Sequence, residues 1–180
     1  MPSPHALSPE ILVNGTTAGA QANASITKLA DGGFVVTWHR SNELYARTFH
    51  VDGTPASGEF LVDVAQSYSF ARVLALSDGR FVVGWEDQYD VFAQVFNANG
   101  SLAGSQLQVA TGALLQYDVS ITALSAGRFV ISWTQDESSG LDANLYGRIY
   151  AADGSASASF RLNGVASGGS LGYQFASPPT

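Results

Sequence analysis

The sequence predicts an all-β repeat protein, and three observations support this prediction. A turn-and-strand segment occurs three times, each copy ends on a tryptophan, and no stretch has the hydrophobic period of a helix. The copies read LADGGFVVTW, LSDGRFVVGW and LSAGRFVISW, and their tryptophans, Trp38, Trp85 and Trp133, lie 47 and 48 residues apart. A repeat of this length that is built from short strands is typical of stacked β-sheet units.

Four short strands are predicted in each unit. The first strand leads into an Asp-Gly or Ala-Gly turn that suits a tight hairpin, and the second strand ends at the tryptophan. The first strands are expected at residues 24–29, 71–76 and 119–124, the third at 44–49, 91–96 and 145–150, and the fourth at 59–62, 106–109 and 160–163. The chain also carries a copy of the fourth strand, EILVN, at residues 10–14.

Side-chain alternation predicts sheets that are packed on both faces. Phe34, Val36 and Trp38 share one face of the second strand, whereas the opposite face carries the smaller Val35 and Thr37. The other two units repeat this division. Sheets that stack large side chains against small ones are what β-propeller blades require. A β-trefoil and a β-prism are the alternatives, although for a trefoil we expect a cleaner alternation of inward and outward residues.

The repeat also predicts the organisation of the chain. We expect a single domain over residues 1–180, with units at about 10–58, 59–105 and 106–163, followed by a partial fourth unit or tail at 164–180. Propellers close with roughly four to eight blades. Three units are therefore expected to form half of a six-bladed ring that a second copy completes, or part of a longer repeat array.

Composition excludes several classes of function. The net charge is −7 and the 8 Lys and Arg residues do not cluster, so we expect no nucleic-acid partner. The chain has no cysteine, which excludes disulfides and thiolate chemistry. No apolar run reaches the roughly 20 residues of a membrane span, and no membrane insertion is expected. No zinc-protease, serine-hydrolase or phosphate-loop motif occurs, so the prediction is that the protein is not an enzyme.

The order of segments within one unit, SI-x-x-LADGGFVVTW followed by LYAR-x-F-x-x-DG and then EFLV, resembles the repeats of large secreted bacterial haemolysin-type and adhesin proteins. It is also similar to the delta-60 type of propeller repeat. The resemblance covers residues 10 to about 163. It implies a secreted or cell-surface protein with an adhesive, lectin-like role. The calcium-binding Gly-Asp nonapeptides of those proteins are absent, so calcium is not implied.

A non-catalytic module that binds glycans at several equivalent inter-repeat sites is the expected function, because repeated weak sites give avidity. The alternative is a self-assembling scaffold without a small-molecule ligand. The candidate ligand-binding residues are Trp38, Arg47, Tyr68, Trp85, Tyr89, Gln94, Tyr117, Trp133 and Arg148. For the tryptophans we weigh core packing against sugar stacking, and for the arginines a bridge between neighbouring units against a ligand contact.

The loops after the tryptophans vary between units, and variable loops on a fixed scaffold are where binding residues collect. The longest is Thr134–Asn144, in which Asp136, Glu137 and Asp142 are candidate oxygen ligands for calcium or are simply solvated acids. Glu86, Asp87 and Asp90 resemble a glycosidase pair only superficially, because no second desolvated carboxyl is evident.

Overall fold

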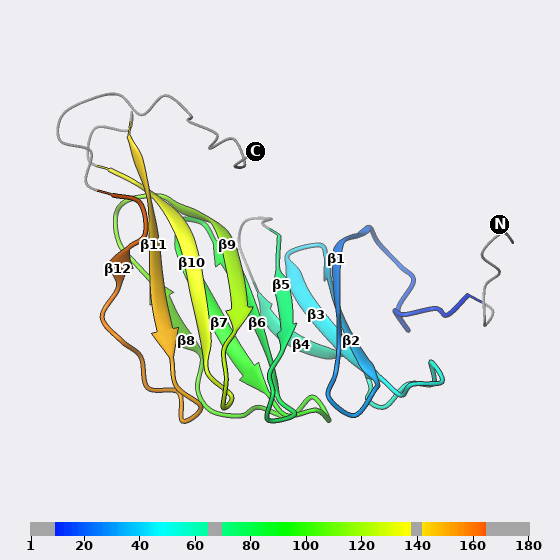
Figure 1. Ribbon diagram of the computed structural model, residues 1–180. Helices are drawn as coiled ribbons and strands as arrows, with labels where there is room; N and C mark the ends of the chain where they lie inside the picture. Colours follow the sequence, from blue (N-terminus) through cyan, green and yellow to red (C-terminus); the bar gives the residue numbers. More distant parts are fainter. Residues whose placement is uncertain (1–9, 65–69, 138–141, 165–180) are drawn as a thin grey trace, which may run out of the picture.

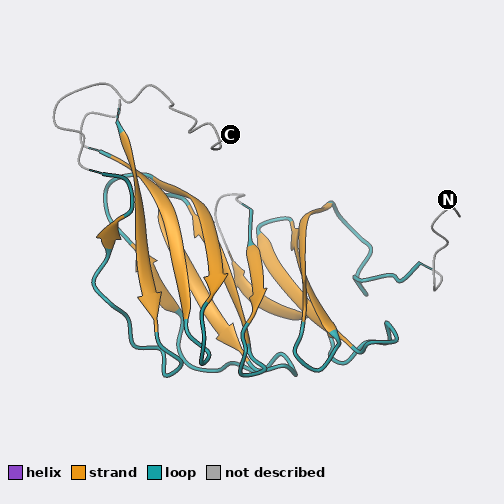
Figure 2. Cartoon of the chain, in the orientation of Figure 1, coloured by secondary structure: helices purple, strands orange, loops and turns teal. Residues whose placement is uncertain are grey.

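The computed structural model describes residues 10–64, 70–137 and 142–164, and these residues form twelve strands and no helix (Figures 1 and 2). The strands are β1 (Gln21–Lys28), β2 (Phe34–Arg40), β3 (Glu43–Phe49), β4 (Phe60–Val64), β5 (Arg72–Ala75), β6 (Phe81–Asp87), β7 (Asp90–Phe96), β8 (Leu107–Ala110), β9 (Gln116–Ala123), β10 (Phe129–Asp136), β11 (Ala143–Tyr150) and β12 (Phe160–Arg161). Because none of the described segments is a helix, none could cross a membrane as one.

The strands form three antiparallel sheets of four strands each, paired in chain order. Sheet 1 contains β1–β4, sheet 2 contains β5–β8 and sheet 3 contains β9–β12. The same hairpin turn enters the tryptophan strand of every sheet, since Leu29, Leu76 and Leu124 each donate a backbone hydrogen bond of 2.8 Å to the residue four positions on. The prediction of an all-β fold with three four-stranded units is confirmed.

The copy of the fourth strand at residues 10–14 is not paired within a single chain. Residues 10–14 lie against sheet 1 without strand pairing, although their sequence copies the fourth strand. A fourth strand needs a third strand beside it to complete its ladder of hydrogen bonds, and the described residues place none next to this segment.

The three sheets lie side by side in chain order, so that sheet 2 separates sheets 1 and 3 (Figure 1). Their first strands are neighbours, with β1 against β5 and β5 against β9. Each sheet has a bulky face, which carries the tryptophan, and a small face on the opposite side. The cross-strand register Trp38–Tyr45 and Thr37–Ala46 assigns these residues to the bulky and small faces of sheet 1.

Each core consists of a small face packed on the bulky face of the following sheet. Val35, Leu44 and Ala46 of sheet 1 share a buried cluster with Val83 and Trp85 of sheet 2. An equivalent cluster joins the small face of sheet 2 to the bulky face of sheet 3. Gly84 shows how close this approach is, because a Cβ there would lie 2.8 Å from Ile121 Cδ1.

Stacked aromatic pairs between the second and third strands stiffen every bulky face. The ring centroids are 6.1–6.2 Å apart in one set and 4.9–5.3 Å apart in the other. The first set is Trp38–Tyr45, Trp85–Phe92 and Trp133–Tyr146, and the second is Phe34–Phe49, Phe81–Phe96 and Phe129–Tyr150.

Replacing Trp85 by alanine should lower the free energy of unfolding by about 3–5 kcal/mol, because the indole is enclosed between two sheets. The change also removes the hydrogen bond of 2.8 Å from Trp85 Nε1 to Asp63 Oδ2. Urea denaturation measures the loss. Tyr89→Ala at an exposed position is the control and should change stability by less than about 0.5 kcal/mol. A cost for Trp85→Ala as small as that of the control would contradict a core role.

Candidate ligand-binding sites

The three tryptophans are core residues. Their exposed fractions are 4% for Trp38, 1% for Trp85 and 2% for Trp133. The side chain of Trp85 is held by Asp63 of the preceding sheet. Trp133 Nε1 has no hydrogen-bond partner within the described residues. The residue of sheet 2 that is equivalent to Asp63 is Ala110, whose side chain cannot accept a hydrogen bond. Trp85 and Trp133 are therefore closed off from a sugar, and the core interpretation of these two residues is the better one.

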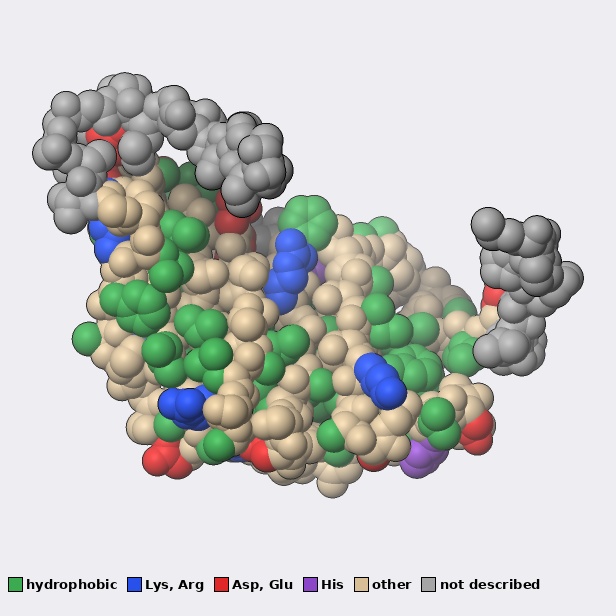
Figure 3. Space-filling model, in the orientation of Figure 1, with side chains coloured by type: hydrophobic (Ala, Val, Ile, Leu, Met, Phe, Trp, Pro, Cys, Tyr) green, Lys and Arg blue, Asp and Glu red, His purple; other side chains and the backbone are tan. Residues whose placement is uncertain are grey.

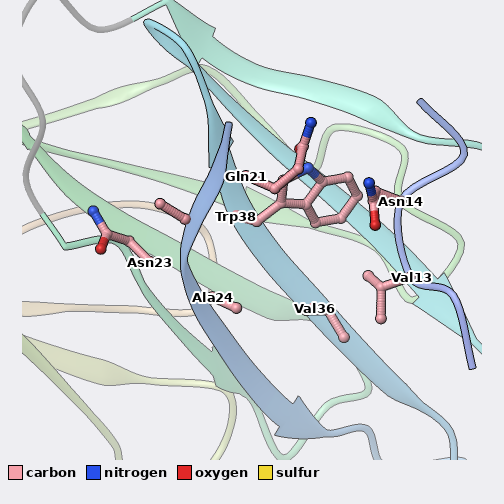
Figure 4. A pocket seen from close by; sticks show the side chains of 8 residues that line it. Val13, Asn14, Gln21, Asn23, Ala24, Val36 and Trp38 are labelled. Carbon is pink, nitrogen blue, oxygen red and sulfur yellow. The ribbon is translucent and has the colours of Figure 1, made fainter. Parts of the chain in front are cut away.

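Trp38 differs because no sheet covers the bulky face of sheet 1. A hollow of about 310 Å³ lies between β1, β2 and the segment that carries Val13 and Asn14 (Figure 4). Apolar atoms dominate its wall, which includes Val36 and the indole of Trp38. Gln21 lies beside the indole at the start of β1 (Figure 4).

Two buried polar atoms border this hollow without hydrogen-bond partners in the described structure, the Trp38 Nε1 donor and the Gln21 Oε1 acceptor. The amide nitrogen of Gln21 is already used, because it donates to the carbonyls of Thr16 and Ala18. Gln116 repeats this arrangement in sheet 3, donating 2.7 Å to Leu114 O while its Oε1 stays unpaired. The pairing of a tryptophan with a glutamine thus recurs in sheets 1 and 3.

Arg47, Gln94 and Arg148 occupy equivalent places on the third strands, and each binds backbone. Arg47 donates to Ser57 O at 3.1 Å and to Val13 O at 3.0 Å. Arg148 donates 3.4 Å to Gln108 O in the neighbouring sheet, and Gln94 donates to Val95 O and Gly104 O. Arg148 is therefore a bridge between sheets, as the structural alternative predicted, and the hydrogen bonds of Arg47 and Gln94 are likewise to the protein backbone.

The two most exposed aromatic residues that the structure describes, Phe70 and Tyr89, lie at what we call the loop edge, where the turns that follow the tryptophan strands meet the starts of β5 and β9. Tyr89 is 56% exposed in the β6–β7 turn, and Phe70 is 60% exposed just before β5. Tyr89 O accepts 3.0 Å from Gln116 N, which places half-buried Tyr117 beside the same turn. Tyr68, also a predicted ligand residue, lies outside the described residues.

Sequence reasoning missed Phe70, and a signal for it existed. Counted back from the leucine that ends each first strand, Phe70 stands where the other units have Asn23 and Asp118. Those two residues have positive φ angles of 56° and 58° and form bulges in β1 and β9. An aromatic residue at an otherwise polar bulge position marks this unit as different.

Carboxylates at the loop edge connect sheets 2 and 3. Glu86 Oε1 accepts 2.8 Å from Val119 N, and Asp90 Oδ1 accepts 3.0 Å from Gly112 N. Burial raises the pKa of Glu86, nearby Asp118 also raises it, and the Val119 hydrogen bond and Arg72 act against the shift. The hydrogen bonds of Glu86 and Asp90 therefore link sheet 2 to the residues that lead into and form β9.

The predicted calcium ligands do not come together. Glu137 accepts hydrogen bonds from Asn144 Nδ2 and, at 3.0 Å, from Tyr146 OH, and these bonds lower its pKa. Glu137 N donates 2.8 Å to Asp142 O, so the loop is closed by the backbone. Among the residues that the structure describes, no three acidic or histidine side chains gather as a metal site, and Asp136, Glu137 and Asp142 are included in that statement.

No protein-family model matches the sequence, and no curated protein is significantly similar to it. Among solved structures, the fold is similar to the "putative exo-beta-1,3-galactanase from Bifidobacterium bifidum s17", with a TM-score of 0.44 and 15% sequence identity. The similarity covers 79% of this chain and 53% of that one, so the chain spans about half the length of the other protein. A similarity of this size carries no activity or substrate over to this chain.

Glu86→Gln should stabilise the protein at about pH 7 and lose this advantage toward about pH 4. The folded pKa of Glu86 is raised, so its ionised form costs stability above that pKa, whereas glutamine keeps the acceptor for Val119 N without the charge. Urea unfolding at both pH values measures the difference. Asp52→Asn is the control of opposite sign, because bonds from Thr54 lower the pKa of Asp52 and its contribution is lost as pH falls. If Glu86→Gln lowered the free energy of unfolding equally at both pH values, ionised Glu86 would not be the destabilising group.

Proposed function

We propose that this chain is a non-catalytic carbohydrate-binding module whose binding surface is the loop edge at the junction of sheets 2 and 3. The observation that carries the proposal is the exposure of Phe70 and Tyr89 at one edge of the fold. Large aromatic residues normally bury most of their surface, and exposed ones at strand ends mark contact sites. Their ring faces suit the apolar faces of pyranose rings.

Polar groups around these rings suit a sugar as well. Asp87 and Asp90 flank the β6–β7 turn, and Asp118 lies at the bulge of β9. Carboxylates accept hydrogen bonds from hydroxyl groups. Arg72, whose guanidinium lies 5.6 Å from the Phe70 ring centroid, adds a donor. With a net charge of −7, the protein favours neutral or basic sugars over sulfated or acidic ones.

The architecture forms part of the proposal. We infer that the three sheets are blades of a β-propeller, because their four-stranded antiparallel order and the neighbouring first strands β1, β5 and β9 suit that fold. The haemolysin-type and adhesin repeats, and the delta-60 repeats, stay a resemblance of the sequence. A secreted or cell-surface location belongs to the same expectation.

The turn residues differ between the sheets, so we propose one binding site at the junction of sheets 2 and 3 in place of several equivalent sites. The position of Tyr89 in the β6–β7 turn is held by Asn42 in the β2–β3 turn, although Ser41 and Gln88 before them share a positive φ of 54° and 56°. The described residues therefore offer an exposed aromatic turn at the junction of sheets 2 and 3 and a polar turn in sheet 1. Avidity would come from several copies of the chain.

A scaffold role is a second candidate, and one observation favours it. No other sheet covers the bulky face of sheet 1 or the small face of sheet 3, so Ile26 and Leu145 are exposed where their counterparts in sheet 2 are buried. Self-association and sugar binding use different surfaces, so the two roles are compatible.

Tyr89→Ala and Phe70→Ala should each weaken binding of a neutral oligosaccharide by roughly tenfold, the value of one aromatic contact. A glycan array identifies the sugar, and titration calorimetry then measures the affinity of the folded variants. Phe160→Ala, which removes an exposed aromatic side chain from β12 instead, is the matched control and should leave the affinity unchanged. The proposal fails if the array shows no bound sugar, or if Tyr89→Ala and Phe70→Ala bind as tightly as the control.

A further inference from the structure

The molecule ends in two different uncovered faces. Ile26 on the bulky face of sheet 1 is 65% exposed, whereas Val73 at the same place in sheet 2 is 8% exposed. Leu145 on the small face of sheet 3 is 40% exposed, whereas Leu44 and Val91 at this place are fully buried. We call the uncovered face of sheet 1, with Ala24 and Ile26, the head face, and that of sheet 3, with Leu145 and Ile149, the tail face.

Apolar side chains gather at the sheet 3 end of the molecule, over β10 and β11 (Figure 3). Leu145, Ile149, Phe160 and Leu162 are each more than one-third exposed there. Apolar counterparts in sheets 1 and 2, such as Leu44, Val91 and Val95, face the next sheet and pack in the core against it. A patch of this kind marks an interaction surface. In sheets 1 and 2 the equivalent small face is covered by the bulky face of the next sheet, so another bulky face would fit here.

The hollow beside Trp38 is the place that such a tail face would fill. Its lining residues Ala24 and Trp38 correspond to Val119 and Trp133 in sheet 3. There Val91 of sheet 2 packs in the same core as Val119 and Trp133. Glu86, which faces Val91 across β6 and β7, also bonds to Val119 N at 2.8 Å. If sheet 3 of a second copy packed on sheet 1 in the same way, its counterparts of Val91 and Glu86 would lie at the hollow.

Those counterparts are Leu145 and Thr134, which face each other across β10 and β11. We propose that the tail face of a second copy docks on the head face, with its Leu145 entering the hollow beside Trp38. This goes beyond the proposed function, because it names a protein partner and a separate surface. The contact is head-to-tail and not self-complementary, so an open pair keeps one free head face and one free tail face until a ring closes. Two copies would contribute six sheets.

The segment Ile11–Asn14 already holds one strand position of the missing neighbour. A Cβ on Gly53 would strike Ile11, just as a Cβ on Gly100 would lie 2.6 Å from the Phe60 ring of the preceding sheet. Val13 packs with Val36 and Trp38, and its carbonyl accepts from Arg47 at 3.0 Å. The segment therefore lies where β4 lies relative to sheet 2, and it lacks only a third strand to pair with.

In the docked pair, the segment of one copy and β12 of the other would occupy the same position. We assign the position to Ile11–Asn14, because it is tied to sheet 1 by Arg47 and by hydrogen bonds from Gly15 and Thr16 to Glu59. Strand β12 has only two paired residues. The segment would then pair with β11 of the second copy, which also satisfies an exposed sheet edge.

The mass of the intact chain in solution, measured by light scattering, is the first test. We expect a dimer. Leu145→Asp should give a monomer, because it places a charge in the apolar hollow, and far-UV circular dichroism checks its fold. Leu102→Asp makes the same change at an exposed leucine of sheet 2, away from both end faces, and should remain dimeric. A monomeric wild-type chain overturns the proposal, and so does a Leu145→Asp protein that is still dimeric.

Direction is tested with cysteines, since the chain has none of its own. Ala24→Cys and Leu145→Cys are made as separate variants and treated with a short bis-maleimide after mixing and subunit exchange. A covalent dimer should form in the mixture and not in either variant alone. Cross-linking of one variant with itself, or a dimeric protein that gives no cross-link in the mixture, would show a different interface and overturn the proposal.

Phe160→Asp decides which strand closes the joined sheet. If Ile11–Asn14 replaces β12, Phe160 lies outside the contact, and the variant should dimerise like the wild type. Loss of the dimer in Phe160→Asp would assign the position to β12 and overturn the exchange of strands.

Discussion

The packing of a small face on a bulky face is the interaction on which the rest of this structure depends. Each sheet is apolar on both sides, so each needs two neighbours, and large side chains such as Trp85 fit only against small ones such as Ala46. A sheet therefore cannot pack on a copy of itself face to like face. The sheets follow one another in a single direction, and the chain order is also the spatial order.

This direction has two consequences for function. A stack that continues only one way always ends in a bulky face at one end and a small face at the other, and these ends are complementary. The exposed Ile26 and Leu145 are the residues at those ends. The loop edge, by contrast, contributes hydrogen bonds of Glu86 and Asp90 between sheets 2 and 3, and its exposed aromatic side chains lie outside the packed faces. Its turns can change in composition without disturbing a core, as the difference between Asn42 and Tyr89 illustrates.

The polar groups in the cores follow the same logic. Buried donors and acceptors need partners, and the repeat supplies them across sheets, as Asp63 does for Trp85 and the carbonyl of Gln108 does for Arg148. The supply is incomplete, because Trp133 Nε1 has no partner in the described residues although sheet 2 covers its face. Trp38 Nε1 and Gln21 Oε1 are unpaired at the head face.

The sequence by itself determined the strand count, the hairpin turns and the two faces, because period-two alternation and Asp-Gly steps are local properties that a 47-residue repeat states three times. It also correctly placed Arg148 between sheets. It could not decide that Trp85 and Trp133 are enclosed while Trp38 borders a hollow, because these equivalent residues differ only in whether a neighbouring sheet is present. It missed Phe70, and it could not decide whether residues 10–14 pair as a strand, because pairing needs a neighbouring third strand that one chain does not place there. Burial, accessible edges and the meeting of Asp90 with Gly112 arise from contacts between units, and only the tertiary structure decides those.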